Sequence, residues 1–136
     1  MGMIVGLYIC DIQLQKYEQI EKEVIYKRFN DTLTKSNVMY ALEMFDVQHK
    51  DKVLSQALLE TGNFKSNICI KYNNIFGLYD SAKRDYYHYS HWIASVLAYK
   101  WKVQKKYKGG CYYDFLERIG YAEDPNYINK LKQFHN

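Results

Sequence analysis

The sequence predicts an all-α domain with one irregular insertion. Apolar residues recur at helical spacing along most of the chain. Glycines or polar turn residues follow most of these runs, and Pro125 is the single proline in 136 residues. Apolar residues make up 48% of the chain, enough for one modest core without a disulfide framework. We expect an N-terminal segment and helix, residues 1–33, to form one compact unit with residues 34–136.

Three helices are predicted in the first half of the chain from apolar residues at helical spacing. Asn30-Asp31-Thr32 breaks the first helix, and Thr34 or Ser36 can cap the second. Gly62 is a stop signal for the third, because glycine readily takes the left-handed conformation after a helix. The predicted ranges are Gln13–Phe29, residue 34 or 36 to about Phe45, and roughly Lys50–Glu60.

The helical pattern is lost over residues 63–90 and then returns. The irregular stretch is rich in Asn, Lys, Tyr, Asp and Ser, and we expect a long loop with at most a helical turn or a small strand pair. A loop of this length in a compact domain is usually functional. Three further helices are predicted at His91–Tyr107, at Tyr112–Ile119, and after a cap at Asp124-Pro125.

The charge of the chain is mildly basic, with a net charge of +4 and a pI near 8.8. This favours acidic partners such as nucleic acid, phospholipid or anionic cell-wall polymers. Lysines are spread along the chain with acidic residues among them, so the sequence does not favour nucleic-acid binding. The apolar run over residues 3–10 is too short to cross a membrane and lacks a clear export signal, so no stable membrane insertion is expected.

Cysteine and histidine patterns predict no metal site and no cofactor. The three cysteines are widely spaced and form no CxxC pair, and the four histidines show no metal-binding motif. A Cys69–Cys111 disulfide stays open at this point, because spacing alone does not decide pairing.

Glu60 is the residue on which a catalytic interpretation depends. It follows Val53 and Ala57 at seven and three residues' distance, so it shares their core-directed stripe of the helix. It also lies at the helix C-terminus, where unpaired carbonyl groups present partial negative charge. Desolvation and this charge both raise the pKa of a carboxyl group, toward the range that a general acid needs. On its own this signal is weak, because most glutamates in a last helical turn are surface residues.

Four stretches of the chain, in the same order, resemble the bacterial endo-β-N-acetylglucosaminidase family, which includes autolysins and the wall-cutting domain of flagellar assembly proteins. The similarity extends from about Thr34 to Leu131. The stretches are LSQALLETGNF at Leu54–Phe64, YNNIFGL at Tyr72–Leu78, YSHWIASVLAY at Tyr89–Tyr99 and GYAEDPNY at Gly120–Tyr127.

The resemblance implies a lysozyme-like helical fold, with a shortened β-lobe, that cuts the glycan of peptidoglycan. Glu60 matches the family's catalytic glutamate, which protonates the glycosidic oxygen, and Tyr99 matches a tyrosine implicated at the active site. The substrate-binding positions that it implies are Asn74, Phe76 and Gly77 in the wall of the sugar cleft, and the aromatic Trp92 and Tyr121 near the groove.

The chain departs from the family in the insertion that bears a second carboxylate in many relatives. Here thirteen residues, Leu78–Ser90, fill that space, and their acids are Asp80 and Asp85. Two-carboxylate glycosidases need a base or nucleophile at a defined distance from the acid. We take Asp85 as the candidate base. The alternative is that the substrate's acetamido group acts as nucleophile, with Tyr99 orienting it.

The leading hypothesis is therefore a peptidoglycan hydrolase that cleaves after N-acetylglucosamine, with Glu60 as general acid. Two alternatives stay open: a lytic transglycosylase on the same substrate, and a catalytically weak peptidoglycan-binding domain. The expected partners are peptidoglycan glycan strands, the expected state is a monomer, and the expected location is periplasmic or secreted, with a phage-type lysin as a further option.

Overall fold

The computed structural model describes residues 15–16, 19–20 and 32–134. The chain divides into two compact units, residues 1–31 and 32–136, and the description below concerns the second. Of the predicted helix Gln13–Phe29, residues 15–16 and 19–20 are described, and they are helical. The rest of that helix, and the expected packing of residues 1–33 onto the remainder, lie outside the described residues.

The first two helices of this unit lie close to their predicted ranges. Helix α2 is Lys35–Met44, and the Thr34 side chain caps it by accepting a hydrogen bond from the Asn37 amide at 3.1 Å. Helix α3 is Lys50–Thr61. Gly62 takes the left-handed conformation at its C-terminus and donates its amide hydrogen to the Leu58 carbonyl, as the sequence predicts.

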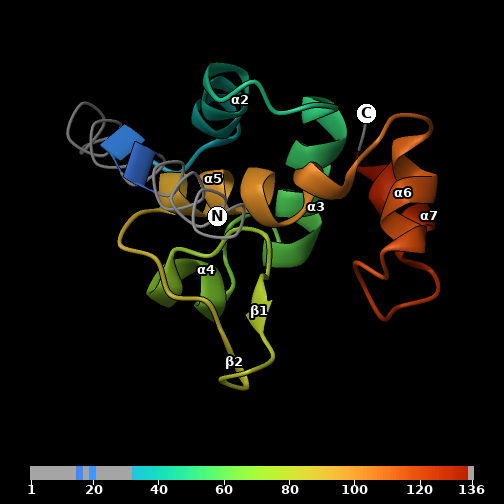
Figure 1. Ribbon diagram of the computed structural model, residues 1–136. Helices are drawn as coiled ribbons and strands as arrows, with labels where there is room; N and C mark the ends of the chain where they lie inside the picture. Colours follow the sequence, from blue (N-terminus) through green and yellow to red (C-terminus); the bar gives the residue numbers. More distant parts are fainter. Residues whose placement is uncertain (1–14, 17–18, 21–31, 135–136) are drawn as a thin grey trace, which may run out of the picture. The chain divides into compact units, whose positions relative to one another are not determined.

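The predicted irregular stretch contains two short elements. Helix α4 is Asn67–Tyr72, capped by Ser66. Strands β1, Tyr79–Asp80, and β2, Asp85–Tyr86, pair antiparallel to form a small hairpin. In Figure 1 this hairpin projects below the helices, on the same side as α4. The small strand pair confirms the expected shortened β-lobe.

The predicted helices of the second half are present, but the first is divided into two and the last begins later than predicted. Residues 91–107 form helix α5, Trp92–Lys102, followed by a 3-10 helix η1, Gln104–Lys106. Helix α6 is Tyr112–Arg118. The last helix, α7, is Tyr127–Gln133, and its N-cap is Asn126 rather than Asp124 or Pro125. Asp124 instead accepts a hydrogen bond from the Asn126 amide at 2.9 Å, which shapes the turn before α7.

The helices form one core in which α3 contacts α2 and α7, and α5 contacts α2 (Figure 1). The unit is mostly helical with one two-stranded hairpin, which confirms the all-α, lysozyme-like prediction. Cys69 and Cys111 are both free, so the disulfide that the sequence left open does not form. Within the described residues, no helix is long and apolar enough to span a membrane.

Candidate active site

Glu60 lies in the last turn of α3, at the edge of the core. Val53 and Ala57, which share its stripe, are completely buried, as the spacing predicts. The Thr61 hydroxyl donates to the Ala57 carbonyl at 2.6 Å and accepts from the Phe64 amide at 2.8 Å, which fixes the chain where the helix ends. The Glu60 side chain is half-buried and lines a cleft. The sequence therefore places a carboxyl group at the boundary between core and solvent.

Burial raises the pKa of Glu60 above its ordinary value, and a side-chain hydrogen bond with Tyr127 partly opposes this rise. Desolvation is the larger effect, so the net direction is upward. A carboxyl group with a raised pKa keeps its proton into less acidic solution, as a general acid must.

The raised pKa of Glu60 makes a prediction about stability. In the unfolded chain Glu60 ionises at its ordinary pKa, whereas the folded protein holds the proton more tightly. Between the Glu60 pKa of the unfolded chain and the higher Glu60 pKa of the folded protein, the free energy of unfolding therefore falls as the pH rises. The fall is about 1.4 kcal/mol for each pH unit that separates the two pKa values. Glu60→Gln removes this loss. Urea unfolding measures the free energy of unfolding of both proteins at pH 4 and pH 7.5. The value for Glu60→Gln minus the value for the wild type should be more positive at pH 7.5. The same difference at both pH values would contradict the raised pKa.

Gly77 lies directly against the Glu60 carboxyl group. Its φ of +65° is a conformation that residues with a side chain rarely adopt, and a Cβ atom placed there would lie 3.0 Å from Glu60 Oε2. Glycine at this position therefore allows the backbone to approach the carboxyl group closely. The sequence predicted Gly77 in the wall opposite Glu60, and the structure brings the two residues together.

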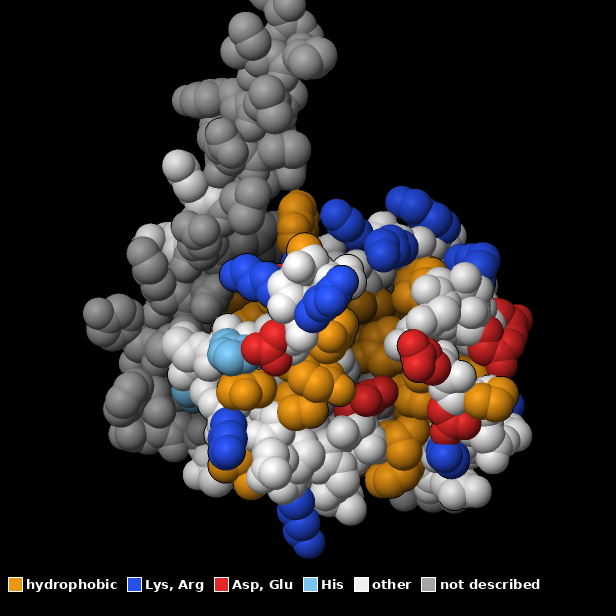
Figure 2. All heavy atoms as spheres, turned by 90° about the horizontal axis from the view of Figure 1, so that it is seen from below, with side chains coloured by type: hydrophobic (Ala, Val, Ile, Leu, Met, Phe, Trp, Pro, Cys, Tyr) orange, Lys and Arg blue, Asp and Glu red, His pale blue; other side chains and the backbone are white. Residues whose placement is uncertain are grey.

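The cleft beside Glu60 has a volume of about 850 Å³. Its walls come from the end of α3, from residues 76–79, from the end of α5 with η1, and from residues 119–130. On the face shown in Figure 2, apolar side chains line a hollow, and basic side chains gather along one edge with acidic side chains across from them. A cleft of this size accommodates a small ligand or a few sugar rings.

Tyr121 and Phe76, two of the predicted substrate-binding residues, both line the cleft. The Tyr121 hydroxyl donates to the Phe76 backbone carbonyl at 2.9 Å, which ties the loop after α6 to the segment that precedes Gly77. Burial and neighbouring groups, Glu60 among them, hold the pKa of Tyr121 well above its ordinary value, so it stays a neutral hydroxyl beside the carboxyl group. Phe76 is 1% exposed and packs against Tyr99, so it acts mainly as a core anchor.

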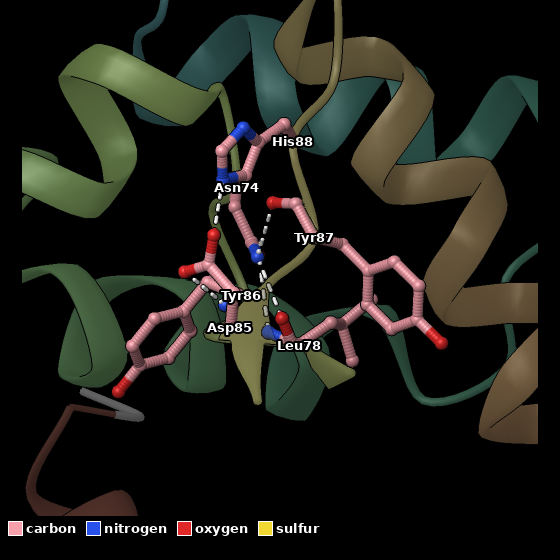
Figure 3. A network of polar contacts seen from close by, with 6 residues as sticks. All are labelled: Asn74, Leu78, Asp85, Tyr86, Tyr87 and His88. Atoms are coloured by element: carbon pink, nitrogen blue, oxygen red, sulfur yellow. Dashed lines mark hydrogen bonds and ion pairs between the residues drawn. The ribbon is translucent and has the colours of Figure 1, made fainter. Parts of the chain in front are cut away.

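Asn74 is completely buried, so the structure does not place it where a substrate would touch it. Its Nδ2 donates to the Leu78 carbonyl at 2.8 Å and the Tyr87 carbonyl at 3.0 Å, while its Oδ1 accepts from the Leu78 amide at 3.0 Å (Figure 3). These bonds hold the two arms of the hairpin to each other. Asn74 therefore shapes the cleft wall from behind, in place of the predicted substrate contact.

Tyr99 is also completely buried, and it does not line the cleft. Its hydroxyl donates to Gln56 Oε1 and lies 2.6 Å from the Tyr112 hydroxyl. The prediction that Tyr99 orients a substrate group directly is therefore not supported by its position. Any influence on catalysis must pass through the side chains that it contacts.

Asp85 lies on β2 and lines a separate hollow with neighbours from the hairpin. Its Oδ2 accepts from or pairs with His88 Nε2 at 3.0 Å, and its Oδ1 accepts from the Tyr86 amide at 2.8 Å (Figure 3). The carboxylates that line the cleft, among the described residues, are Glu60, Glu123 and Asp124. The structure thus does not bring the predicted base Asp85 into the cleft with Glu60.

Trp92 is buried at the start of α5 and does not line the cleft, so it is part of the core. Other residues that line the cleft were not identified from the sequence: Tyr79 and Tyr87 from the hairpin region, Tyr127 from α7, and Glu123. Tyr127 could not be identified in this way, because spacing along one helix does not reveal which other helix a side chain faces. No cluster of metal-binding side chains occurs among residues 32–134, where the structure is described.

The comparison with protein families gives one match, which covers the residues of this cleft. Residues 35–136 match the family model Glucosaminidase, described as mannosyl-glycoprotein endo-beta-N-acetylglucosaminidase. Comparison with the curated proteins and with the solved structures gives no match. The family match spans the helix that bears Glu60, the hairpin and the last helix, and therefore every wall of the cleft. The chain belongs to the glucosaminidase family of peptidoglycan hydrolases, and it is a glycoside hydrolase.

Proposed function

We propose that this protein hydrolyses the peptidoglycan glycan strand after N-acetylglucosamine, with Glu60 as the general acid. The observation that supports this most is the position of Glu60: a half-buried carboxyl group, with a raised pKa, in the wall of a cleft that can hold sugar rings. In its protonated form Glu60 would donate to the glycosidic oxygen as the bond to the sugar breaks.

The cleft also offers aromatic surface for sugar rings. Tyr79 is 52% exposed and lines the cleft, and Tyr87 lines it nearby. Aromatic rings present a flat apolar face to the C–H groups of a sugar while the hydroxyl group stays in water. We propose that these tyrosines from the hairpin region, together with Tyr121, bind the glycan. They take the place of the predicted contacts at Asn74 and Trp92.

The second catalytic group is proposed to be the substrate's own acetamido oxygen. Asp85 lies in another hollow, and the Asp124 carboxylate is bound to Lys130. Glu123 is the remaining carboxylate of the cleft, and it is the protein side chain that could act as the second catalytic group instead. A thiazoline analogue of N-acetylglucosamine mimics the ring that the acetamido group would form. Competitive inhibition by it would support the proposal; loss of activity in Glu123→Gln without such inhibition would assign Glu123 instead, and loss in Asp85→Asn would restore Asp85.

The proposed bond and reaction are tested by the ends that digestion creates. Purified peptidoglycan is digested, reduced with borohydride and analysed by mass spectrometry. The expected product ends in reduced N-acetylglucosamine. Products that end in reduced N-acetylmuramic acid would show that the other glycosidic bond is cut. Products that end in an anhydro sugar would show that the protein is a lytic transglycosylase. Binding to insoluble wall without any new ends would leave only a binding domain.

Lysines on one wall of the cleft predict a dependence on salt and on substrate charge. Lys102, Lys105 and Lys106 all line the cleft, and Lys102 Nζ lies 4.5 Å from the centre of the Tyr87 ring. We expect the triple change of these lysines to Gln to raise KM for anionic peptidoglycan fragments several-fold at low salt, and much less at 0.5 M salt, because salt screens exposed charges. A neutral chitin oligosaccharide is the control substrate. An equal change in KM for both substrates would contradict an electrostatic role.

A further inference from the structure

A continuous network of buried side-chain hydrogen bonds leads from Gln104 in η1 to Tyr127, which lines the cleft together with Glu60. Its first three members are Gln104, Tyr112 and Tyr99: Gln104 Nε2 lies 3.1 Å from the Tyr112 hydroxyl, which lies 2.6 Å from the Tyr99 hydroxyl. The Tyr99 hydroxyl then contacts Gln56 Oε1, and Gln56 Nε2 lies 3.3 Å from the Tyr127 hydroxyl. Gln56, Tyr99 and Tyr112 are at most 1% exposed, so water does not compete for these bonds.

The direction of this chain is fixed at its start by the backbone. The Gln48 amide donates to Gln104 Oε1 at 3.0 Å, and Gln104 Nε2 donates to the Gln48 carbonyl at 2.6 Å. Because a backbone N–H can only donate, the oxygen of the Gln104 amide group must face it, and the nitrogen must face Tyr112. Gln104 is therefore a donor to Tyr112.

Each later member then has one arrangement that satisfies all the bonds. A tyrosine hydroxyl has one hydrogen to donate. Tyr112 accepts from Gln104 and donates to Tyr99, and Tyr99 donates to Gln56 Oε1. The Gln56 nitrogen donates to Tyr127, which leaves the Tyr127 hydrogen available to donate to Glu60. The two residues line the same cleft, and the Tyr127 hydroxyl lowers the pKa of Glu60. The network starts at Gln104, whose donor group is fixed by the backbone, and ends at a carboxyl group, which can accept. All its hydrogen bonds can therefore donate in the same direction, from Gln104 toward Glu60.

We infer that Gln56 and Tyr127 are positioning residues for Glu60: they hold one carboxyl oxygen as a hydrogen-bond acceptor, so that the other oxygen holds the proton for transfer. Without the chain, the Tyr127 hydroxyl could equally accept from a protonated Glu60, and the acid proton would point into the core. If protonated Glu60 donated to Tyr127, which already accepts from Gln56, the Tyr127 hydrogen would have no acceptor within this hydrogen-bond network. The buried network therefore selects which oxygen of Glu60 is the acid.

This inference deepens the proposed function, since it assigns how the Glu60 acid is oriented. It also gives Tyr99 a position in the site without any contact to substrate. The hydrogen bond from Tyr127 stabilises the ionised carboxylate, so its removal should raise the Glu60 pKa further. Bonds further back along the chain should act in the same direction, but more weakly, through polarisation of their neighbours.

The test is a ¹³C NMR titration of the Glu60 side-chain carboxyl signal, identified by its absence from Glu60→Gln. In Tyr127→Phe we expect the Glu60 pKa to rise by about one pH unit, the size of a hydrogen bond to a charged group. In Tyr112→Phe we expect a rise of a few tenths of a pH unit. Tyr113→Phe, a tyrosine of α6 outside both the chain and the cleft, is the matched control and should leave the pKa unchanged.

An unchanged Glu60 pKa in Tyr127→Phe would overturn the inference. An unchanged Glu60 pKa in Tyr112→Phe would show that only the contact between Tyr127 and Glu60 affects the carboxyl group. If Tyr127→Phe does not fold, Gln56→Met removes the donor to Tyr127 at similar side-chain length, and a smaller rise, of a few tenths of a pH unit, is expected. With soluble glycan, the alkaline limb of activity should move with the pKa while KM changes little. The NMR result does not need activity: a pKa shift in a protein that cuts no glycan would refute the proposed function and leave the chain intact.

Discussion

Glu60→Gln is expected to lower the rate of peptidoglycan cleavage by about 10²–10⁴-fold, the usual contribution of a general acid. Glutamine keeps the size of the side chain and still accepts a hydrogen bond from Tyr127, but it has no proton to give to the leaving oxygen. The fold should be retained. Compared with the wild type, the variant should be relatively more stable at neutral pH than at pH 4. Release of soluble muropeptides from purified cell wall measures the rate.

The matched control is Glu117→Gln, an exposed glutamate of α6 that does not line the cleft. It makes the same change from a carboxyl group to an amide and should cleave at the wild-type rate. If Glu60→Gln and its control clear cell wall equally well in a zymogram, Glu60 is not the acid. An inactive Glu60→Gln that is also unfolded by circular dichroism would point to a structural role instead.

Gly77→Ala is expected to reduce cleavage by about 10–10²-fold, because the new Cβ would lie 3.0 Å from Glu60 Oε2 and displace the carboxyl group. Small displacements of a reacting group have effects of this size on rate. The positive φ adds a strain of about 1 kcal/mol to the folded state. Activity and urea unfolding, measured on the same preparation, separate the two effects.

Gly120→Ala provides the control for backbone strain. Gly120 has a φ of +63°, close to that of Gly77, and nothing lies within 4 Å of a Cβ placed there. Both variants should lose similar stability, while only Gly77→Ala should lose most of its activity. Equal losses of activity in the two variants would mean that the contact with Glu60 does not matter.

The helices could be predicted from the sequence because their signals are local. Helix α3 lies within one residue of its predicted end, since Gly62 and the spacing of Val53 and Ala57 are read along a single helix. The hairpin was foreseen only as an option, because its strands have two residues each and are too short to show an alternation. Asn74 holds it together through three bonds that connect residues up to 13 positions apart.

The candidate site could be predicted only where it depends on one helix or on the family resemblance. Glu60, Gly77 and Tyr121 were named from the sequence and line one cleft. Tyr99, Asn74 and Trp92 were also named, but tertiary packing buries all three, and an apolar or amide side chain gives no local sign of which side it faces. Gln56 and Tyr127 were missed because their importance lies in contacts between α3, α5 and α7, which no pattern within one segment reveals.

The central claim is that protonated Glu60 delivers the proton to the glycan. The most direct measurement compares two values in the wild-type protein: the pKa of Glu60 from the ¹³C NMR titration, and the pH at which kcat/KM for a soluble peptidoglycan fragment falls on the alkaline side. The account predicts that the two values coincide, above the ordinary pKa of a glutamate, and that both move upward together in Tyr127→Phe. An alkaline limb at a pH unrelated to the Glu60 titration would show that another group supplies the proton.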